Sequence, residues 1–393
     1  MKINKVYIGG WFQRTMLQLS EIYDFLRNGS SQLDLDKRKL ENLRKNLMIG
    51  RIDYYVRGLE YIEYMTSVGI TVKIFEDGLI TLNNEEASED TLFMDIEKLT
   101  DYYENNLSKA INYLFSLGAP VPKELANIEN IYPYFVILDK ATKNQITDLM
   151  ARTERQKYFE IKNKKFDVIR GDKYYFINNK TGDIDSIERY IEEQIFIREF
   201  KGQLHRYLNL HRIIWEKIAD VKENAYVKGK NIVEFSGKIE DYYKTITLIE
   251  GRINQMSTYI TTREKIAKSD EDLTEFLAIQ GYRYETLKDT LTYIQHLWNM
   301  TKNYVNSAKS LFSDLESKVT EKSIGNLTIV TSMGVGASLI GLFTNSAPTF
   351  TSFGVFYFFI LAIIGYSVNK LMKFISKNRK YHIQDIEYDK NIK

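Results

Sequence analysis

The stretch LTIVTSMGVGASLIGLFTNSAPTF, from Leu327 to Phe350, has the strongest influence on the predicted fold. It contains no charged residue, although 27% of the chain is charged. Glycine, serine and threonine interrupt its apolar residues at regular intervals. An uncharged segment of this length is typical of a membrane helix, and its small and polar residues need a separate explanation.

The uncharged region extends in both directions, from Ser323 to Asn369, and two apolar runs lie wholly or largely within it, Ile324–Phe343 and Phe353–Met372. Each run is long enough to cross a hydrocarbon core of about 30 Å. The turn TNSAPTFTS separates them, and basic residues follow the second run. Because basic residues favour the cytosolic side, we expect a transmembrane hairpin over 323–372 and a basic cytosolic tail over 373–393. The alternative is a buried hairpin of a soluble protein.

This reading predicts a multi-pass protein of the cell inner membrane or plasma membrane, with both termini cytoplasmic. Upstream of the hairpin, apolar residues recur at alternating spacings of four and three, which indicates one helix packed along a seam. At 1.5 Å per residue, this stalk helix is about 70 Å long. The seam positions are Leu273, Leu277, Gln280, Tyr284, Leu287, Leu291, Ile294, Trp298, Thr301, Val305, Ala308, Phe312, Leu315 and Val319.

Two further helical patterns precede the stalk, so residues 184–322 are expected to form a cytosolic helical bundle with the stalk helix. Residues 1–183 have a mixed pattern, with the strand-like runs KVYIGG and YFVILD, several hairpins and amphipathic helices. The predicted fold class is therefore an α+β membrane protein with an N-terminal α/β cytosolic domain.

Continuing the stalk spacing into the first span, with one small shift, defines a stripe of mostly small and polar residues. One explanation is close helix packing, for which small residues are common in membranes. The other is a pore lining, with an apolar gate at its cytosolic end. Because two spans cannot enclose a pore, the second explanation requires several chains around one axis. The stripe consists of Ile324, Leu327, Thr331, Gly334, Ser338, Gly341 and Asn345.

Composition excludes several classes of site. The chain has no cysteine, which excludes disulfides and thiolate metal sites, and its four histidines are scattered singly. A net charge of +2 gives no indication of direct nucleic-acid binding. No catalytic constellation is recognisable, so we expect a protein that is not an enzyme.

One candidate ligand site stands at a predicted strand-to-helix turn, where Gly9, Gly10 and Trp11 are followed by Arg14. Backbone amides and Arg14 there would suit a phosphate, and Trp11 would suit a base. The alternative is a tight turn that needs glycine.

The run IGNLTIVTSMGVGASLIGLF, together with the long stalk, the hairpin and the basic tail, resembles the CorA family of two-span cation channels and transporters. The resemblance implies a homopentameric funnel whose first span lines the pore. The chain departs from the family at the outer mouth, where Thr344-Asn345-Ser346 stands in place of Gly-Met-Asn. This departure weakens the case for a magnesium site.

The missing filter motif and the enlarged N-terminal region are similar to a CorA branch that accompanies type III CRISPR systems. That resemblance implies an antiviral channel gated by a nucleotide second messenger, a conjugate of S-adenosylmethionine and AMP. The first alternative is a transporter of divalent cations such as Mg²⁺ with a variant filter. The second is a non-conducting scaffold anchored in the lipid membrane.

Overall fold

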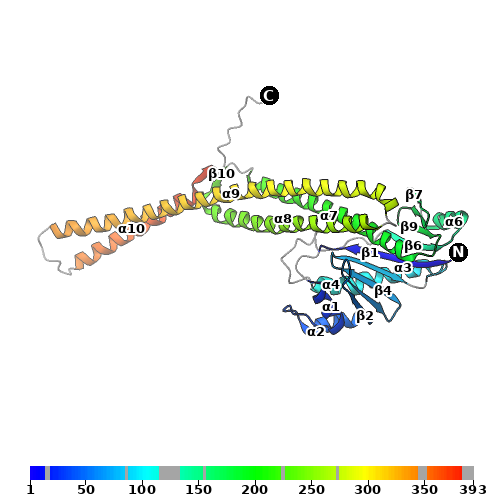
Figure 1. Ribbon diagram of the computed structural model, residues 1–393. Coiled ribbons are helices and arrows are strands. Elements are labelled where there is room, and N and C mark those ends of the chain that lie inside the picture. The colour runs from blue at the N-terminus through cyan, green and yellow to red at the C-terminus, as the bar shows by residue number, and fades with distance from the viewer. Residues whose placement is uncertain are drawn as a thin grey trace, which may run out of the picture. The chain divides into compact units, whose positions relative to one another are not determined.

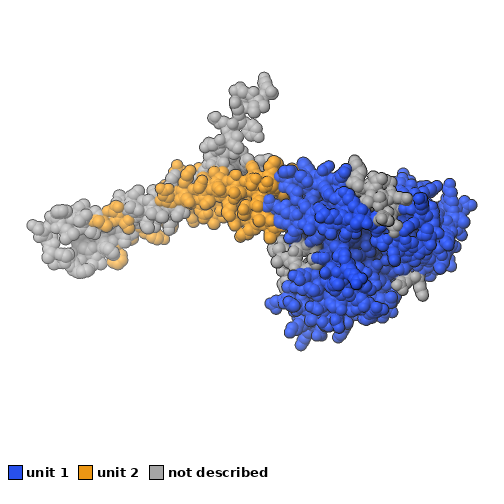
Figure 2. All heavy atoms as spheres, in the orientation of Figure 1, with its two compact units in different colours: residues 1–210, 249–296 blue, residues 211–248, 297–393 orange. Residues whose placement is uncertain are grey.

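The computed structural model describes residues 1–13, 18–84, 87–114, 133–153, 156–222, 226–270, 274–343 and 352–382, and within α7, α9 and α10 some residues by their backbone alone. These residues divide into two compact units, coloured separately in Figure 2. Unit 1 comprises residues 1–210 and 249–296, and unit 2 comprises residues 211–248 and 297–393.

Unit 1 is built on a nine-stranded mixed sheet with the strand order β2-β3-β4-β5-β1-β6-β9-β8-β7 (Figure 1). Its neighbouring strands are antiparallel except for β6 and β9, which run parallel. The strands are β1 (Ile3–Trp11), β2 (Ile49–Tyr55), β3 (Tyr61–Thr66), β4 (Ile70–Phe75), β5 (Leu79–Asn84), β6 (Tyr134–Asp139), β7 (Phe159–Lys162), β8 (Phe166–Arg170) and β9 (Tyr174–Asn179).

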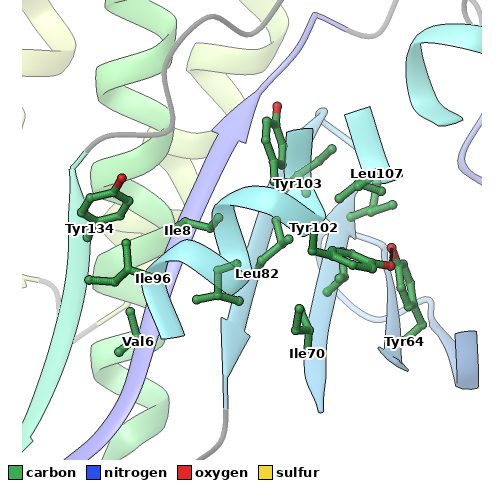
Figure 3. Close-up of a cluster of buried hydrophobic side chains, with 14 of the residues drawn as sticks. Val6, Ile8, Tyr64, Ile70, Leu82, Ile96, Tyr102, Tyr103, Leu107 and Tyr134 are labelled. Atoms are coloured by element: carbon green, nitrogen blue, oxygen red, sulfur yellow. Dashed lines mark hydrogen bonds between the residues drawn. The ribbon is translucent and has the colours of Figure 1, made fainter. Parts of the chain in front are cut away.

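One face of this sheet is apolar because every second residue of the central strands is aliphatic or aromatic. Val6, Ile8 and Leu82 on this face pack with Tyr102 and Leu107 (Figure 3). Burying each such side chain contributes about 1.5–3 kcal/mol. The short helices of this layer are α1 (Leu19–Asn28), α2 (Lys37–Asn46), α3 (Leu92–Asp101), η1 (Tyr102–Leu107) and α4 (Ser108–Leu114).

The opposite face is more polar and packs against the long helices α7 (Ile184–Lys222) and α8 (Ile232–Ser269). Trp11 is fully buried there, with its ring 5.7 Å from that of Phe200 on α7 and 5.8 Å from that of Tyr259 on α8. The indole Nε1 of Trp11 donates to the Asp77 carbonyl oxygen at 2.7 Å. Another helix of unit 1, α6 (Lys143–Thr153), follows β6. Unit 1 therefore has a sheet with helices on both faces.

Unit 2 contains parts of α7, α8 and α9 (Thr274–Phe343) together with α10 (Ser352–Asn378). Trp298 is fully buried, and the Nε2 of His211 lies 2.7 Å from the Thr301 hydroxyl. A two-stranded antiparallel ribbon joins β10 (Tyr226–Lys228) to β11 (Lys380–His382), with the 3-10 turn η3 (Gly229–Asn231) after β10. Helix α9 covers 70 residues, and its seam positions from Tyr284 to Trp298 are buried.

The predicted fold class, a CorA-like funnel with a transmembrane hairpin, is wrong. Among the described residues, which include α9 and α10, no helix combines enough length and apolar content to cross a membrane. The expected spans Ile324–Phe343 and Phe353–Met372 lie in α9 and α10, and over their described residues these helices do not meet that requirement. The membrane, ion-channel and multi-pass inner-membrane or plasma-membrane predictions conflict with the same finding.

Candidate functional site

An open cleft of about 730 Å³ lies at one edge of the sheet in unit 1. Strands β6 and β9 are parallel neighbours, so their carboxyl ends, Asp139 and Asn179, share this edge. Strand β1 is antiparallel to β6, which brings its start at Ile3 to the same edge. Clefts outside the carboxyl ends of parallel strands are common ligand sites in α/β proteins. The volume is also in the usual range for small-molecule sites.

The lining of the cleft is rich in hydrogen-bonding groups. Lys2, Asn4 and Lys5 come from the start of β1, whereas Ser88 and Thr91 precede α3. The Nζ of Lys2 lies 4.0 Å from a carboxylate oxygen of Asp139, and the Lys2 side chain is 76% exposed. This ion pair is weak, because a surface ion pair contributes only about 0–1 kcal/mol to stability. Lys2 is therefore available to an anionic ligand.

Asn179 supplies a buried donor that has no partner. The residue is 1% exposed, and its Oδ1 accepts from the backbone N–H groups of Thr181 at 3.2 Å and Gly182 at 2.9 Å. Those two donors fix the orientation of the amide, because only its oxygen can accept from them. Among the described residues its Nδ2 has no hydrogen-bond partner, at a cost of about 1–3 kcal/mol. Because Asn179 lines the cleft, a ligand acceptor that reached Nδ2 would remove this cost.

The backbone beside the cleft is strained at the residue that follows β6. Lys140 adopts a φ of 46°, in the left-handed region, and its N–H donates to the Asn179 carbonyl oxygen at 3.0 Å. This conformation costs a non-glycine residue about 1–2 kcal/mol. Backbone strain of this kind concentrates at ligand sites.

The N-terminus of α7 forms another part of the cleft wall. Gly182 has a φ of 91°, which suits glycine, and it allows the chain to turn from β9 into the helix. The Asp183 carboxylate accepts from the Ser186 N–H at 3.2 Å and the Ser186 hydroxyl at 2.7 Å. Together with Lys165, these hydrogen bonds lower the pKa of Asp183 to about 2. Because Ile184 lines the cleft, the positive end of the α7 dipole lies at its wall.

An ion-pair network extends from the cleft beneath α7. Glu188 on α7 accepts from Lys5 at 3.1 Å, from Lys73 at 2.8 Å and from the Tyr7 hydroxyl. Burial alone would raise the pKa of Glu188, but Lys73, Tyr7 and Lys5 lower it to about 2. Glu188 is therefore ionised at neutral pH. Lys5 belongs to both the cleft and this network.

Further along α7 the buried carboxyl groups have the opposite character. Burial raises the pKa of Glu192 to about 7 and that of Glu193 to about 8, although Lys73 and Arg263 oppose the rise for Glu192 and Arg263 opposes it for Glu193. Glu193 is 2% exposed, and its Oε1 has no hydrogen-bond partner. Next to them, Arg263 on α8 donates two hydrogen bonds to Asp77, and both side chains are 3% exposed.

The structure places the predicted ligand residues Gly9 and Trp11 between the sheet and α7. A Cβ on Gly9 would lie 2.5 Å from the Ile80 carbonyl oxygen and 2.8 Å from Cδ1 of Ile195. The Gly9 carbonyl accepts from Arg198 at 2.9 Å. Gly10 belongs to the same strand and is buried, and Arg14 lies outside the described residues. The glycine at position 9 thus serves close packing in this structure.

The predicted pore stripe lies mainly in α9. Thr331 is exposed, and Asn345 lies outside the described residues. The other stripe positions are described by their backbone alone, and all belong to α9: Ile324, Leu327, Gly334, Ser338 and Gly341. The part of the chain that the structure describes contains no group of three histidine, aspartate or glutamate side chains suited to a metal ion.

Sequence reasoning did not identify Lys2, Lys5, Asp139 or Asn179. A signal was present, because YFVILD and YYFINN are apolar runs that end in polar residues. Its meaning depends on the parallel pairing of β6 and β9, which the sequence pattern does not reveal.

Comparison with known protein families finds no family model that matches the chain. A search of curated proteins likewise finds no significant match. The resemblance to the CorA family therefore stays an untested prediction, as does the homo-oligomer that it implies.

Proposed function

We propose that this chain is a receptor for a small anionic ligand of the nucleotide class, bound in the cleft at the carboxyl ends of β6 and β9. The observation that carries the proposal is the unpartnered Nδ2 of buried Asn179 in a cleft that also contains two lysines. Lys2, Lys5 and the N-terminal amides of α7 are suited to phosphate oxygens. Asp139 is suited to a ribose hydroxyl or an amino group.

Ligand binding would also act on α7. A phosphate near Lys5 would compete with Glu188 for its ammonium group, and Glu188 is held by Lys73 as well. The ligand would then bind more tightly to a state in which Lys5 is released from Glu188 on α7 than to the state in which they are paired. Such a difference in affinity is the requirement for a population shift. The protein would thus act as a nucleotide-responsive regulator. The adenosylmethionine–AMP conjugate is the ligand to test first.

A channel and a magnesium transporter both require membrane spans, which the described residues do not contain. The membrane-anchored scaffold depends on the same spans.

Calorimetric titration with AMP, ATP and the adenosylmethionine–AMP conjugate tests the proposal. We expect saturable binding of at least one of them, weakened about tenfold by Lys2→Ala, as expected for the loss of one charge-assisted contact. Asn179→Asp keeps the acceptor oxygen for Thr181 and Gly182 but replaces the donor with a negative charge, so it should abolish binding. Lys37→Ala, an exposed lysine at the start of α2, is the matched control. Equal affinities for Lys2→Ala, Asn179→Asp and Lys37→Ala would refute the cleft as the site.

A further inference from the structure

Three arginines converge on Tyr175 at the other end of β9, away from the cleft residue Asn179. The guanidinium carbon of Arg170 lies 5.3 Å from the Tyr175 ring centroid. Burial raises the pKa of Tyr175, and the positive charges of Arg170, Arg283 and Arg198 oppose that rise. They come from β8, α9 and α7, so the tertiary fold of unit 1 is required to bring them together.

The positive charge of this cluster is only partly balanced by the partners that the structure describes. Arg198 pairs with Glu199 at 2.9 Å and donates to the Gly9 carbonyl. Arg283 donates to the neutral amide oxygen of Gln194 at 3.0 Å. Arg170 lies against the rings of Tyr158, Phe159 and Tyr175.

Two of the guanidinium groups also have unused donors. The Nε of Arg170 and the Nη1 of Arg198 are buried and have no hydrogen-bond partner in the part of the chain that the structure describes. A buried N–H of a charged group is costly to leave unpaired, and the usual partner is a carboxylate or phosphate oxygen. All three side chains remain partly exposed, so an anion can approach them from solvent and reach the two buried donors once the guanidinium groups turn.

We propose that Arg170, Arg198 and Arg283 form a second anion site, specific for a phosphoryl group. Guanidinium groups match the geometry of phosphate oxygens through parallel N–H donors. The rings of Tyr158 and Phe159 beside Arg170 provide apolar surface next to the charge. The site shares no residue with the cleft, so it does not depend on the function proposed above.

Thermal unfolding of the full chain in phosphate, against chloride at equal ionic strength, tests the proposal. We expect phosphate to raise the Tm of the wild type, with a half-maximal concentration about tenfold higher in Arg170→Gln and in Arg283→Gln. Arg189→Gln is the control, because Arg189 shares α7 with Arg198 but lies outside the cluster and pairs with Asp270 at 2.6 Å. Lys2→Ala should respond to phosphate at this site as the wild type does.

A second measurement on the wild type avoids the risk that a variant fails to fold. Phenylglyoxal modifies arginines, and modified peptides can be identified by mass spectrometry. Phosphate should slow modification of Arg170 and Arg283 but leave Arg189 unchanged. Equal modification rates with and without phosphate, or a phosphate response that survives in both glutamine variants, would overturn the proposal.

Discussion

Gly9 sets the distance between the sheet and α7 in unit 1. Its missing side chain leaves space for Ile195, and its carbonyl accepts from Arg198. The neighbouring Trp11 is covered by Phe196 and Phe200 from the same helix. The glycine that suggested a phosphate-binding turn thus allows two elements to approach closely.

Gly9→Ala should therefore destabilise the protein by about 1–3 kcal/mol, the usual cost of overpacking a rigid interior. The new methyl group would meet the Ile80 carbonyl oxygen, which cannot move without disturbing β5. Urea unfolding measures the change. Gly202→Ala on α7 is the control, because its added Cβ would meet nothing within 4 Å. That substitution should stabilise the helix by up to about 1 kcal/mol. Equal effects at both positions would contradict the argument.

The Asp77–Arg263 pair makes a second residue-scale prediction. Removing one partner of a buried ion pair leaves an uncompensated charge and costs about 3–5 kcal/mol. Arg263→Met should show this loss in urea unfolding, and the double variant Asp77→Asn, Arg263→Met should recover part of it. The control is Arg51→Met, because Arg51 pairs with Asp53 at 2.7 Å but is 81% exposed. Its cost should stay below about 1 kcal/mol. A double variant that is no more stable than Arg263→Met would contradict the prediction.

At the scale of elements, α7 has two kinds of buried carboxyl group on one helix. Glu188 is ionised because Lys5, Lys73 and Tyr7 surround it. Glu192 and Glu193 are one turn further along and face Lys73, Glu188, Asp77 and Arg263. Three basic groups, Lys5, Lys73 and Arg263, do not balance the four acids of this buried layer, so protonation supplies the remaining compensation.

This layer predicts how stability depends on pH. Glu192 and Glu193 have folded-state pKa values of about 7 and about 8, above their ordinary value of 4.5. The folded state therefore binds more protons than the unfolded state between pH 4.5 and 8, and stability falls as the pH rises through that window. Glu188, with a pKa of about 2, has the opposite effect and loses its contribution between pH 4.5 and 2.

Urea unfolding from pH 5 to pH 9 measures this dependence. The free energy of unfolding should decrease over the series by on the order of 3–5 kcal/mol. Glu193→Gln mimics the protonated acid, so it should flatten the curve and gain stability relative to the wild type at pH 9. Glu285→Gln, an exposed acid on α9, should keep the wild-type slope. A wild-type curve that is level from pH 5 to 9 would disprove the pKa assignment.

At the scale of the whole molecule, the local sequence patterns predicted individual strands and helices better than they predicted which distant segments pair. The runs KVYIGG and YFVILD are strands, and the predicted seam from Tyr284 to Trp298 is buried. The pattern did not reveal that β1 lies between β5 and β6, because that order joins segments far apart in sequence. Nor did the pattern reveal that Glu193 on α7 is buried, because the charged groups near it, Asp77 and Arg263, come from the turn after β4 and from α8.

The candidate site was missed for the same reason. Asp139 and Asn179 meet only because β6 and β9 are parallel neighbours, and Lys2 joins them because β1 runs antiparallel to β6. The membrane prediction failed for a different reason. It relied on length and missing charge alone, and over the described residues no helix, α9 and α10 included, is long and apolar enough to cross a membrane.

Unit 1 is made of two separate stretches of the chain, and this leads to a prediction about fragments. Its sheet is contained in residues 1–210, but the unit also includes residues 249–296. That second stretch supplies Arg263 for Asp77 and Tyr259 for Trp11. A fragment that ends at residue 210 would therefore lose the cation that pairs with Asp77 and the ring that covers the Trp11 indole.

We expect the fragment 1–210 to lack a cooperative thermal transition, and the fragment 1–296 to unfold cooperatively. Far-UV circular dichroism follows the transition, and Trp11 is the only tryptophan in the shorter fragment, so its fluorescence reports the environment directly. Its emission should be red-shifted towards that of exposed tryptophan. Adding Asp77→Asn to the fragment 1–210 removes the unpaired charge and should restore part of the structure, which separates the charge effect from the loss of packing. A fragment 1–210 with a cooperative transition and buried Trp11 would show that the sheet does not need α8 and α9.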